Sequence, residues 1–247
     1  MEKTEEIERL QEIINTSDNI VFFGGAGVST ESGIPDFRSV DGLYFQKWDY
    51  PPEQIISRTF FNNNPEEFYR FYREKLLPKN IEPNAAHKKL AEMEAKGKLK
   101  AVITQNIDGL HQKAGSKTVY ELHGSTLRNY CQKCHSFYDE KIIEDSENSP
   151  DRLPHCPKCN GIIKPDVVLY EEPLNQETIN NAVQSIMNAD TLIIGGTSLT
   201  VYPAAGLINY FHGKHLVLIN KSATPQDSMA ELVIHEPIGE VLSQITV

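Results

Sequence analysis

The sequence predicts an α/β fold: a parallel sheet covered by helices on both faces, with a small discontinuous domain added to it. Short apolar runs alternate with amphipathic helical patterns along most of the 247 residues, and this alternation is typical of parallel sheets. One stretch differs. Residues 128–165 hold all four cysteines and few aliphatic residues, so this insert needs its own source of stability.

Two helix starts are well marked in the first half of the chain. Thr4 can cap a helix whose apolar residues share one face. Asn64-Pro65-Glu66-Glu67 combines a cap, a proline at the first position and acidic residues in the first turn. The elements expected here are helices at 4–16, 64–77 and 84–97, and strands at 20–23, 101–104 and 119–122.

Residues 39–64 show little periodicity but are dense in aromatic residues, with Tyr44, Phe45, Trp48 and Tyr50 close together. Two interpretations stay open. The aromatic residues form a satellite core under a long loop, or the stretch is a mobile lid over a cofactor.

Strands and helices alternate again after the insert. The elements expected are strands at 167–170, 191–194, 215–219 and 232–234, helices at 175–187 and 203–211, and a terminal helix that contains Val241, Leu242 and Ile245. We therefore expect three parts. Residues 1–40, 86–127 and 166–247 form the sheet domain, residues 41–85 a loop and helical module, and residues 128–165 a zinc-ribbon insert.

Composition narrows the classes of function. The formal net charge of −10 argues against nucleic acid as a partner, because phosphate binding relies on lysine and arginine. The charge suits basic, lysine-bearing polypeptide partners, and solubility alone explains it as well. No apolar run approaches the roughly 20 residues of a membrane helix, and the acidic N-terminus lacks the apolar region of a secretory signal. We expect a cytoplasmic protein with reduced cysteines.

The stretch from Ile20 to Arg38 has the layout that binds a pyrophosphate. A buried strand runs into Gly24-Gly25-Ala26-Gly27, and a segment that can start a helix follows. Glycine lets the backbone approach the phosphates, and the free N–H groups of a helix start point at the anion. The dinucleotide fingerprint is incomplete, because Thr30 stands where the third glycine belongs. Pro35, Asp36 and Phe37 then place a rigid residue, an acid and an aromatic ring beside Arg38.

The four cysteines predict a metal site. Cys131 and Cys134 form one C-x2-C pair, Cys156 and Cys159 form a second, and 21 residues separate the two pairs. This is the spacing of a four-thiolate zinc site. Four cysteines leave no open coordination position, so we expect one structural Zn²⁺. His135 and His155 lie next to cysteines and are possible competing ligands.

Polar residues follow several of the predicted strands, where ligands bind in parallel sheets. They are Gln105-Asn106-Ile107-Asp108, His123, Thr197-Ser198 and Asn220. An imidazole is the usual base near neutral pH. Position ranks His123 and His111 above the other six histidines.

Three motifs of this chain resemble those of the sirtuins, the NAD-dependent protein deacylases, and the resemblance extends from about residue 20 to 238. The motifs are Gly25-Ala26-Gly27 with its continuation to Arg38, Gln105 to Asp108 with His123-Gly124, and Lys164 to Glu172. The resemblance implies a bacterial-type single-domain sirtuin with a Rossmann-like NAD-binding domain. Its reaction would consume NAD and an acetyl-lysine protein and yield lysine, nicotinamide and O-acetyl-ADP-ribose.

The same resemblance implies roles for individual residues. Asn106 and Asp108 would hold nicotinamide, Gln105 would contact the adjoining ribose, and His123 would be the catalytic base. Phe37 would shield the reactive carbon from water, and Arg38 would face the phosphates. Thr197, Ser198 and Asn220 would hold the adenosine half, with Ile238 against adenine. The full NAD set is Gly25, Ala26, Gly27, Thr30, Phe37, Arg38, Gln105, Asn106, Ile107, Asp108, His123, Gly196, Thr197, Ser198, Asn220 and Ile238.

The resemblance also places the acyl-lysine groove and suggests its acyl preference. Val167, Val168 and Tyr170 would contact the substrate, with the strand pairing to the peptide backbone. Glu171 stands where the family has glycine. Members that remove succinyl or malonyl groups carry a tyrosine and an arginine three residues apart, and this chain has Tyr69 and Tyr72 there. We therefore expect acetyl or another uncharged acyl group.

Two alternatives remain. The same fold can transfer ADP-ribose to protein, as some sirtuin branches do. A non-enzymatic zinc-ribbon binding module is the other, and the net charge and the motifs around Asn106 and His123 argue against it.

Overall fold

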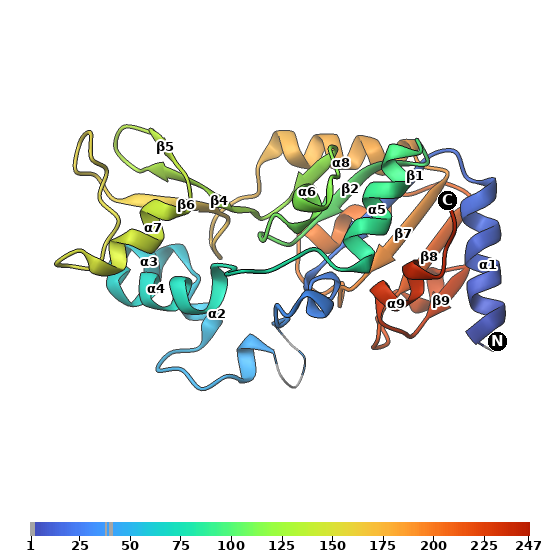
Figure 1. The fold of residues 1–247 in the computed structure, drawn as a ribbon, viewed down its shortest axis with the longest axis horizontal. Helices are drawn as coiled ribbons and strands as arrows, with labels where there is room; N and C mark the ends of the chain where they lie inside the picture. Colours follow the sequence, from blue (N-terminus) through green and yellow to red (C-terminus); the bar gives the residue numbers. More distant parts are fainter. Residues whose placement is uncertain (1–2, 38, 40–41) are drawn as a thin grey trace.

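Six parallel strands form the central sheet of the computed structural model, which describes residues 3–37, 39 and 42–247. They are β1 (Ile20–Gly24), β2 (Leu99–Thr104), β3 (Val119–Glu121), β7 (Thr191–Gly195), β8 (His215–Ile219) and β9 (Leu232–Ile234). Their order across the sheet is β3-β2-β1-β7-β8-β9 (Figure 1). The chain thus adds β2 and β3 on one side of β1, and then β7, β8 and β9 on the other side. Ligands bind at such a switch point, which here lies between β1 and β7.

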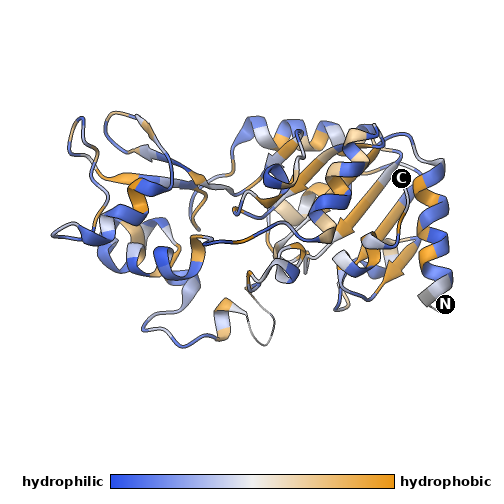
Figure 2. Ribbon diagram, in the orientation of Figure 1, coloured by the Kyte–Doolittle hydropathy of each residue, from blue (hydrophilic) through white to orange (hydrophobic). Residues whose placement is uncertain are grey.

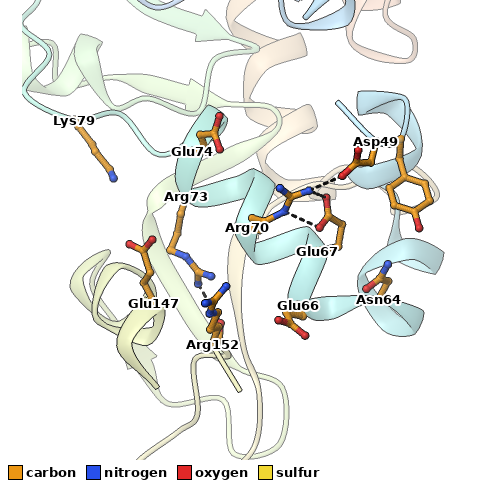
Figure 3. A pocket seen from close by; sticks show the side chains of 11 residues that line it. Asp49, Asn64, Glu66, Glu67, Arg70, Arg73, Glu74, Lys79, Glu147 and Arg152 are labelled. Carbon is orange, nitrogen blue, oxygen red and sulfur yellow. Dashed lines mark hydrogen bonds and ion pairs between the residues drawn. The ribbon is translucent and has the colours of Figure 1, made fainter. Parts of the chain in front are cut away.

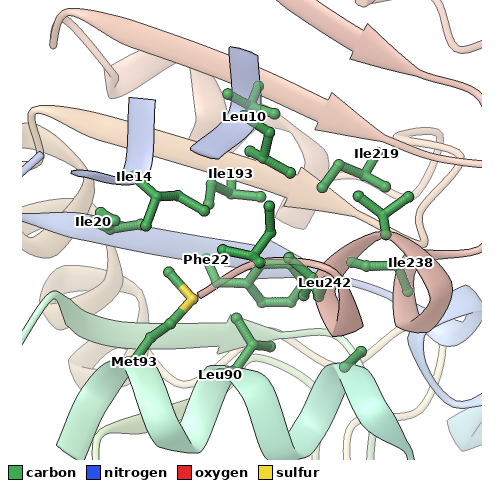
Figure 4. Packing of buried hydrophobic residues seen from close by; sticks show 14 of the residues in the cluster. Leu10, Ile14, Ile20, Phe22, Leu90, Met93, Ile193, Ile219, Ile238 and Leu242 are labelled. Carbon is green, nitrogen blue, oxygen red and sulfur yellow. The ribbon is translucent and has the colours of Figure 1, made fainter. Parts of the chain in front are cut away.

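Helices cover both faces of this sheet, so the predicted fold class is confirmed. The flanking helices are α1 (Lys3–Thr16), α5 (Ala85–Ala95), α6 (Leu110–Ala114), α8 (Gln176–Asn188) and α9 (Ile238–Ser243). Side chains of β1 alternate between two buried clusters. Phe22 packs with Leu90 and Met93 of α5 on one face (Figure 4), while Phe23 joins Ala182 and Ile186 of α8 on the other. Each fully buried side chain of this size contributes about 1.5–3 kcal/mol.

A smaller part extends from one end of the sheet domain (Figure 1). It contains a three-stranded antiparallel sheet of β4 (Gly124–Cys131), β5 (Phe137–Tyr138) and β6 (Ile163–Val167), with α7 (Lys141–Asp145). It also contains α2 (Pro52–Ile55), α3 (Arg58–Asn63) and α4 (Pro65–Phe71), which continues as a π-helix over Tyr72–Leu76. Figure 2 shows that apolar residues are sparser here than in the sheet domain. The predicted division into three parts stays a prediction.

The helices and the cysteine insert share a single buried cluster. Phe61 and Tyr69 of the helices lie in the same cluster as Cys131, Cys156 and other residues of the insert. Aromatic residues of the 39–64 stretch join it, because the Trp48 ring contacts the Phe71 ring edge-on at 5.3 Å. The satellite-core interpretation therefore describes this stretch from Trp48 onward.

Some predicted elements differ from the observed ones. The expected helix after Gly27 is two short 3-10 helices, Ala26–Val28 and Thr30–Ser32, because Gly33 takes a left-handed conformation and Pro35 follows. The expected helix at 203–211 is also 3-10, over Ala204–Tyr210, a segment whose interior contains Gly206, a residue of low helix propensity.

The expected strand at 167–170 is wrong. β6 ends at Val167 and pairs antiparallel with β4 outside the parallel sheet. The chain then turns, with the Glu172 amide donating to the Leu169 carbonyl at 3.0 Å. Glu171 has φ +76° at the third position of this turn, and such a conformation cannot continue a strand.

No helix within the described ranges has the length and apolar character of a transmembrane span.

Candidate functional site

The loop after β1 lies directly against the loop after β7. The Gly27 amide donates to the Gly196 carbonyl at 2.8 Å, and the Gly25 amide to the Gly195 carbonyl at 3.3 Å. A Cβ on Gly27 would lie 2.8 Å from the Gly196 Cα, so only glycine permits this approach. The Thr30 hydroxyl donates to the Gly27 carbonyl at 2.9 Å. The predicted loop residues Gly25, Ala26, Gly27, Thr30 and Gly196 therefore form one structure at the switch point.

A buried hydrogen-bonded chain connects this loop to the segment after β2. Asn106 Nδ2 donates to Ser29 Oγ at 3.1 Å, and Ser29 Oγ donates to Asp108 Oδ2 at 2.7 Å. Burial raises the pKa of Asp108, while hydrogen bonds from the Leu110 amide and the Ser29 hydroxyl oppose that rise. A carboxylate has about four acceptor sites, so Asp108 can accept from a further donor.

Ser29 is a site residue that the sequence reasoning missed. It is only 1% exposed and joins two residues more than 75 positions away along the chain. Its place inside the glycine-rich signature was the available signal, but a serine in a polar turn is common and gave no reason to single it out.

The adenosine-side candidates lie at the same sheet edge. Gln105 Nε2 donates to Thr197 Oγ1 at 3.1 Å, which joins the ends of β2 and β7. Ser198 Oγ bonds Thr200 Oγ1 at 2.8 Å, and Asn220 Nδ2 donates to the Ser222 carbonyl at 2.7 Å. Ile238 is buried against Gly195, since a Cβ on that glycine would come within 2.2 Å of Ile238 Cδ1.

His123 has the geometry of a general base. Its Nδ1 lies 3.0 Å from the Gln105 carbonyl oxygen. A carbonyl only accepts, so Nδ1 carries the proton and Nε2 keeps a free lone pair in the neutral ring. Burial lowers the pKa of His123, with the Gln105 hydrogen bond opposing the shift. The rival His111 is 1% exposed and packs against His87 with ring centroids 4.7 Å apart, so it lies in the core.

The segment after β6 lies beside His123. The Val168 amide donates to the His123 carbonyl at 2.9 Å, while the Val168 carbonyl has no partner among the described residues. Val167 is buried and Tyr170 is 40% exposed. Ile107 connects the segment after β2 to β4, because its carbonyl accepts both the amide and the hydroxyl of Thr126 on β4.

Phe37 approaches the same segment through Tyr44. The two rings contact edge-on at 5.7 Å, and the Tyr44 hydroxyl bonds the Tyr170 hydroxyl at 2.9 Å. Arg38 lies outside the described residues.

The four cysteines fit a tetrahedral ion. Their sulfur atoms all lie within 4.8 Å of one another, with Cys131 and Cys159 at 3.4 Å and Cys134 and Cys156 at 3.6 Å. Zn–S bonds of about 2.3 Å require sulfur separations of about 3.8 Å. His155 is turned to the Asp151 carboxylate at 2.7 Å, away from a ligand role. The thiolates would hold one structural zinc.

A cavity of about 530 Å³ lies elsewhere, among α4, the insert and residues 49–50 (Figure 3). Two of its arginines are already bonded to neighbouring residues. Arg70 bonds Glu67 and Asp49, and Arg73 bonds the Ser146 hydroxyl and the Arg152 carbonyl. Neither the polar residues that follow the strands nor the glycine loop line it, so it is separate from the site at the strand ends.

The switch-point glycine loop, the polar strand ends and the four-thiolate insert together define a dinucleotide-binding α/β protein with a structural metal module. The Sir2 family pattern matches residues 25–203. This chain belongs to the Sir2 family, the sirtuins.

Individual relatives are similar over nearly their whole length. An "NAD-dependent protein deacetylase" of Clostridium perfringens is 62% identical over 244 residues, 98% of each chain. A structure described as "Sir2-p53 peptide-NAD+" has a TM-score of 0.86 at 40% identity, covering 96% of this chain and 95% of that one. A Sir2 variant with a deacetylated p53 peptide and 3'-O-acetyl-ADP-ribose has a TM-score of 0.89 at 39% identity, with 96% of both chains covered.

Proposed function

We infer that this protein is an NAD-dependent protein-lysine deacetylase that produces deacetylated lysine, nicotinamide and O-acetyl-ADP-ribose. The observation that carries this inference is the position of His123. Its Nε2 lies in a site that also holds the Asn106–Ser29–Asp108 chain and the Val168 carbonyl, and neither Nε2 nor this carbonyl has a partner among the described residues. The names of the relatives and the ligands of the Sir2 structures support the same reaction.

The nicotinamide end of NAD is assigned to the Asn106–Ser29–Asp108 chain. A carboxamide offers two N–H donors and a carbonyl acceptor. Asp108 can accept from its NH2 group, and Asn106 can both donate and accept. Because Ser29 fixes both side chains, the pocket is preorganised before the ligand arrives.

His123 is assigned the proton transfer. Its lowered pKa keeps the ring neutral at pH 7, so Nε2 can take a proton from a ribose hydroxyl. After the acetyl oxygen has displaced nicotinamide from the ribose, that hydroxyl would attack the acetyl carbon, and the bond from this carbon to the lysine nitrogen would break as lysine leaves as the amine. The Gln105 carbonyl holds the ring orientation through Nδ1.

The acetyl-lysine side chain is assigned to the space between Val167, Val168 and Phe37. The Val168 carbonyl can accept the N–H of the acetylated side chain, which an unmodified lysine would present as a charged ammonium. Tyr170, with its hydroxyl on Tyr44, would border the peptide. Gln105, Thr197, Ser198, Asn220 and Ile238 are assigned to the ribose and adenosine portions of NAD.

The test is nicotinamide release with and without acetyl-lysine peptide, for wild type, His123→Ala and the exposed-histidine control His212→Ala. We expect peptide-dependent release by wild type and the control. His123→Ala should lose about 100-fold or more in deacetylation while retaining NAD binding. Equal deacetylation by His123→Ala contradicts the assignment. Mass spectrometry of the peptide decides the reaction, because added ADP-ribose without loss of acetyl would identify an ADP-ribosyltransferase instead.

A further inference from the structure

Residues 164–172 are shaped by two side chains at their ends, Lys164 and Glu172. Lys164 is 8% exposed. Its Nζ donates to the Val167 carbonyl at 2.8 Å and pairs with Glu172 Oε2 at 3.1 Å. Glu172 Oε2 also accepts the Leu169 amide at 2.9 Å. The ion pair therefore occupies the main-chain groups on both sides of Val168.

The remaining main-chain groups of this turn bond to neighbouring elements. The Val168 amide donates to His123. The Tyr170 amide donates to the Ile56 carbonyl at 3.0 Å, and the Tyr170 carbonyl accepts the Arg58 amide at 3.0 Å. Within the described residues this leaves the Val168 carbonyl without a partner, while the Val168 amide and both main-chain groups of Leu169 are bonded.

The charges make this arrangement costly to disturb. Burial lowers the pKa of Lys164, and Glu172 opposes the shift. Arg58 NH1 lies 3.1 Å from Glu172 Oε1, so two cations share one carboxylate. Removing Glu172 would leave the buried Lys164 charge uncompensated, which costs far more than the pair contributes when intact, whereas removing Lys164 leaves Glu172 paired with Arg58.

We propose that Lys164 and Glu172 are positioning residues for the substrate peptide: they hold the main chain around Val168 so that its carbonyl faces the acyl-lysine. This inference rests on the proposed function. Neither side chain bonds any of the residues assigned to nicotinamide or adenosine, so their effect should fall on peptide binding and leave NAD binding unchanged.

The experiment compares Lys164→Met with Lys164→Arg and with a matched control, Lys89→Met. Lys89 is also a partly buried lysine that bonds a main-chain carbonyl, that of Ile245 at 2.8 Å, and pairs with Glu92 at 2.7 Å, but it lies on α5. We expect Lys164→Met to raise the peptide KM roughly ten-fold, with kcat and the NAD KM within about two-fold of wild type. Lys164→Arg should recover most of the loss, and the control should match wild type.

A merely structural role would act differently, since partial unfolding lowers the active fraction and leaves both KM values unchanged. An unchanged peptide KM, or an equal rise in both KM values, overturns the proposal. Should Lys164→Met not fold, Glu172→Gln tests the same pair, because it removes the charge that holds Lys164 while the glutamine oxygen can still accept the Leu169 amide; the same rise in the peptide KM is expected. Failure of the proposed function is separate, as wild type itself would then deacetylate no peptide.

Discussion

Acid should destabilise this protein through two buried histidines, His87 and His111. Their rings contact each other at an interplanar angle of 59° and are buried. His87 Nδ1 accepts the Asn84 amide at the start of α5, while both His111 nitrogens lack partners among the described residues. Burial lowers the pKa of His87 to about 4 and that of His111 to about 3.

The sign follows from linkage. The folded-state pKa lies below the unfolded value of 6.5, so stability is fully present above pH 6.5 and is lost as pH falls toward the folded values. At pH 5 the unfolded imidazoles are almost fully protonated, while the folded ones remain neutral. Between pH 7 and pH 5 each ring therefore costs about 2 kcal/mol, or about 4 kcal/mol for the pair. This figure hardly depends on the folded pKa, provided that it is well below 5.

The assay is urea unfolding of the zinc-loaded protein at pH 7 and pH 5, for wild type, His111→Leu and the control His212→Ala. Zinc release and other titrations affect all three chains alike, so the difference between them isolates one ring. Wild type and the control should lose about 2 kcal/mol more than His111→Leu over this range. Equal losses in wild type and His111→Leu would refute the reasoning, because the ring would then titrate in the folded state as it does in the unfolded chain.

Three further predictions concern the insert, the turn and the acyl group. Zinc chelation or Cys131→Ala should lower the melting temperature, because Cys131 lies in the buried cluster shared with α3 and α4. Unchanged thermal unfolding would exclude a stabilising role for the zinc site. Glu171→Gly should be more stable than Glu171→Ala by about 0.5–1 kcal/mol, because φ is +76° at this position and both variants lack the carboxylate. A higher free energy of unfolding for Glu171→Ala in denaturant titrations would count against this. Acetyl-lysine peptide should turn over faster than succinyl-lysine peptide, because Tyr72 is buried and its hydroxyl has no partner in the described part of the chain, while Arg70 and Arg73 bond elsewhere. The opposite ranking in a kinetic comparison would overturn this.

The sheet and its polar edge were predictable because both rest on local patterns. Apolar runs define the strands, and the carboxyl ends of parallel strands meet at one edge, which brings Gln105 and Thr197 into contact. The cysteine spacing is equally local. Ser29 and the Lys164–Glu172 pair were not predictable, because their roles depend on how irregular loops pack, and no periodicity encodes that packing.

The departure at Glu171 shows how one position serves two requirements. The turn needs a positive φ, which glycine adopts freely. Glutamate is strained in this conformation, but its carboxylate accepts hydrogen bonds from the Thr59 amide and hydroxyl at 2.8 and 2.7 Å, at the start of α3.

These contacts join the peptide segment to both parts of the molecule. On one side Val168 bonds His123 at the edge of the catalytic site. On the other, Tyr170 and Glu171 bond residues 56–59, whose helices share a core with the cysteine insert. A metal with no open coordination position can therefore affect catalysis without contacting a reactant. It would stabilise the core shared by the insert and α2 to α4, and the peptide-binding segment is bonded to that core.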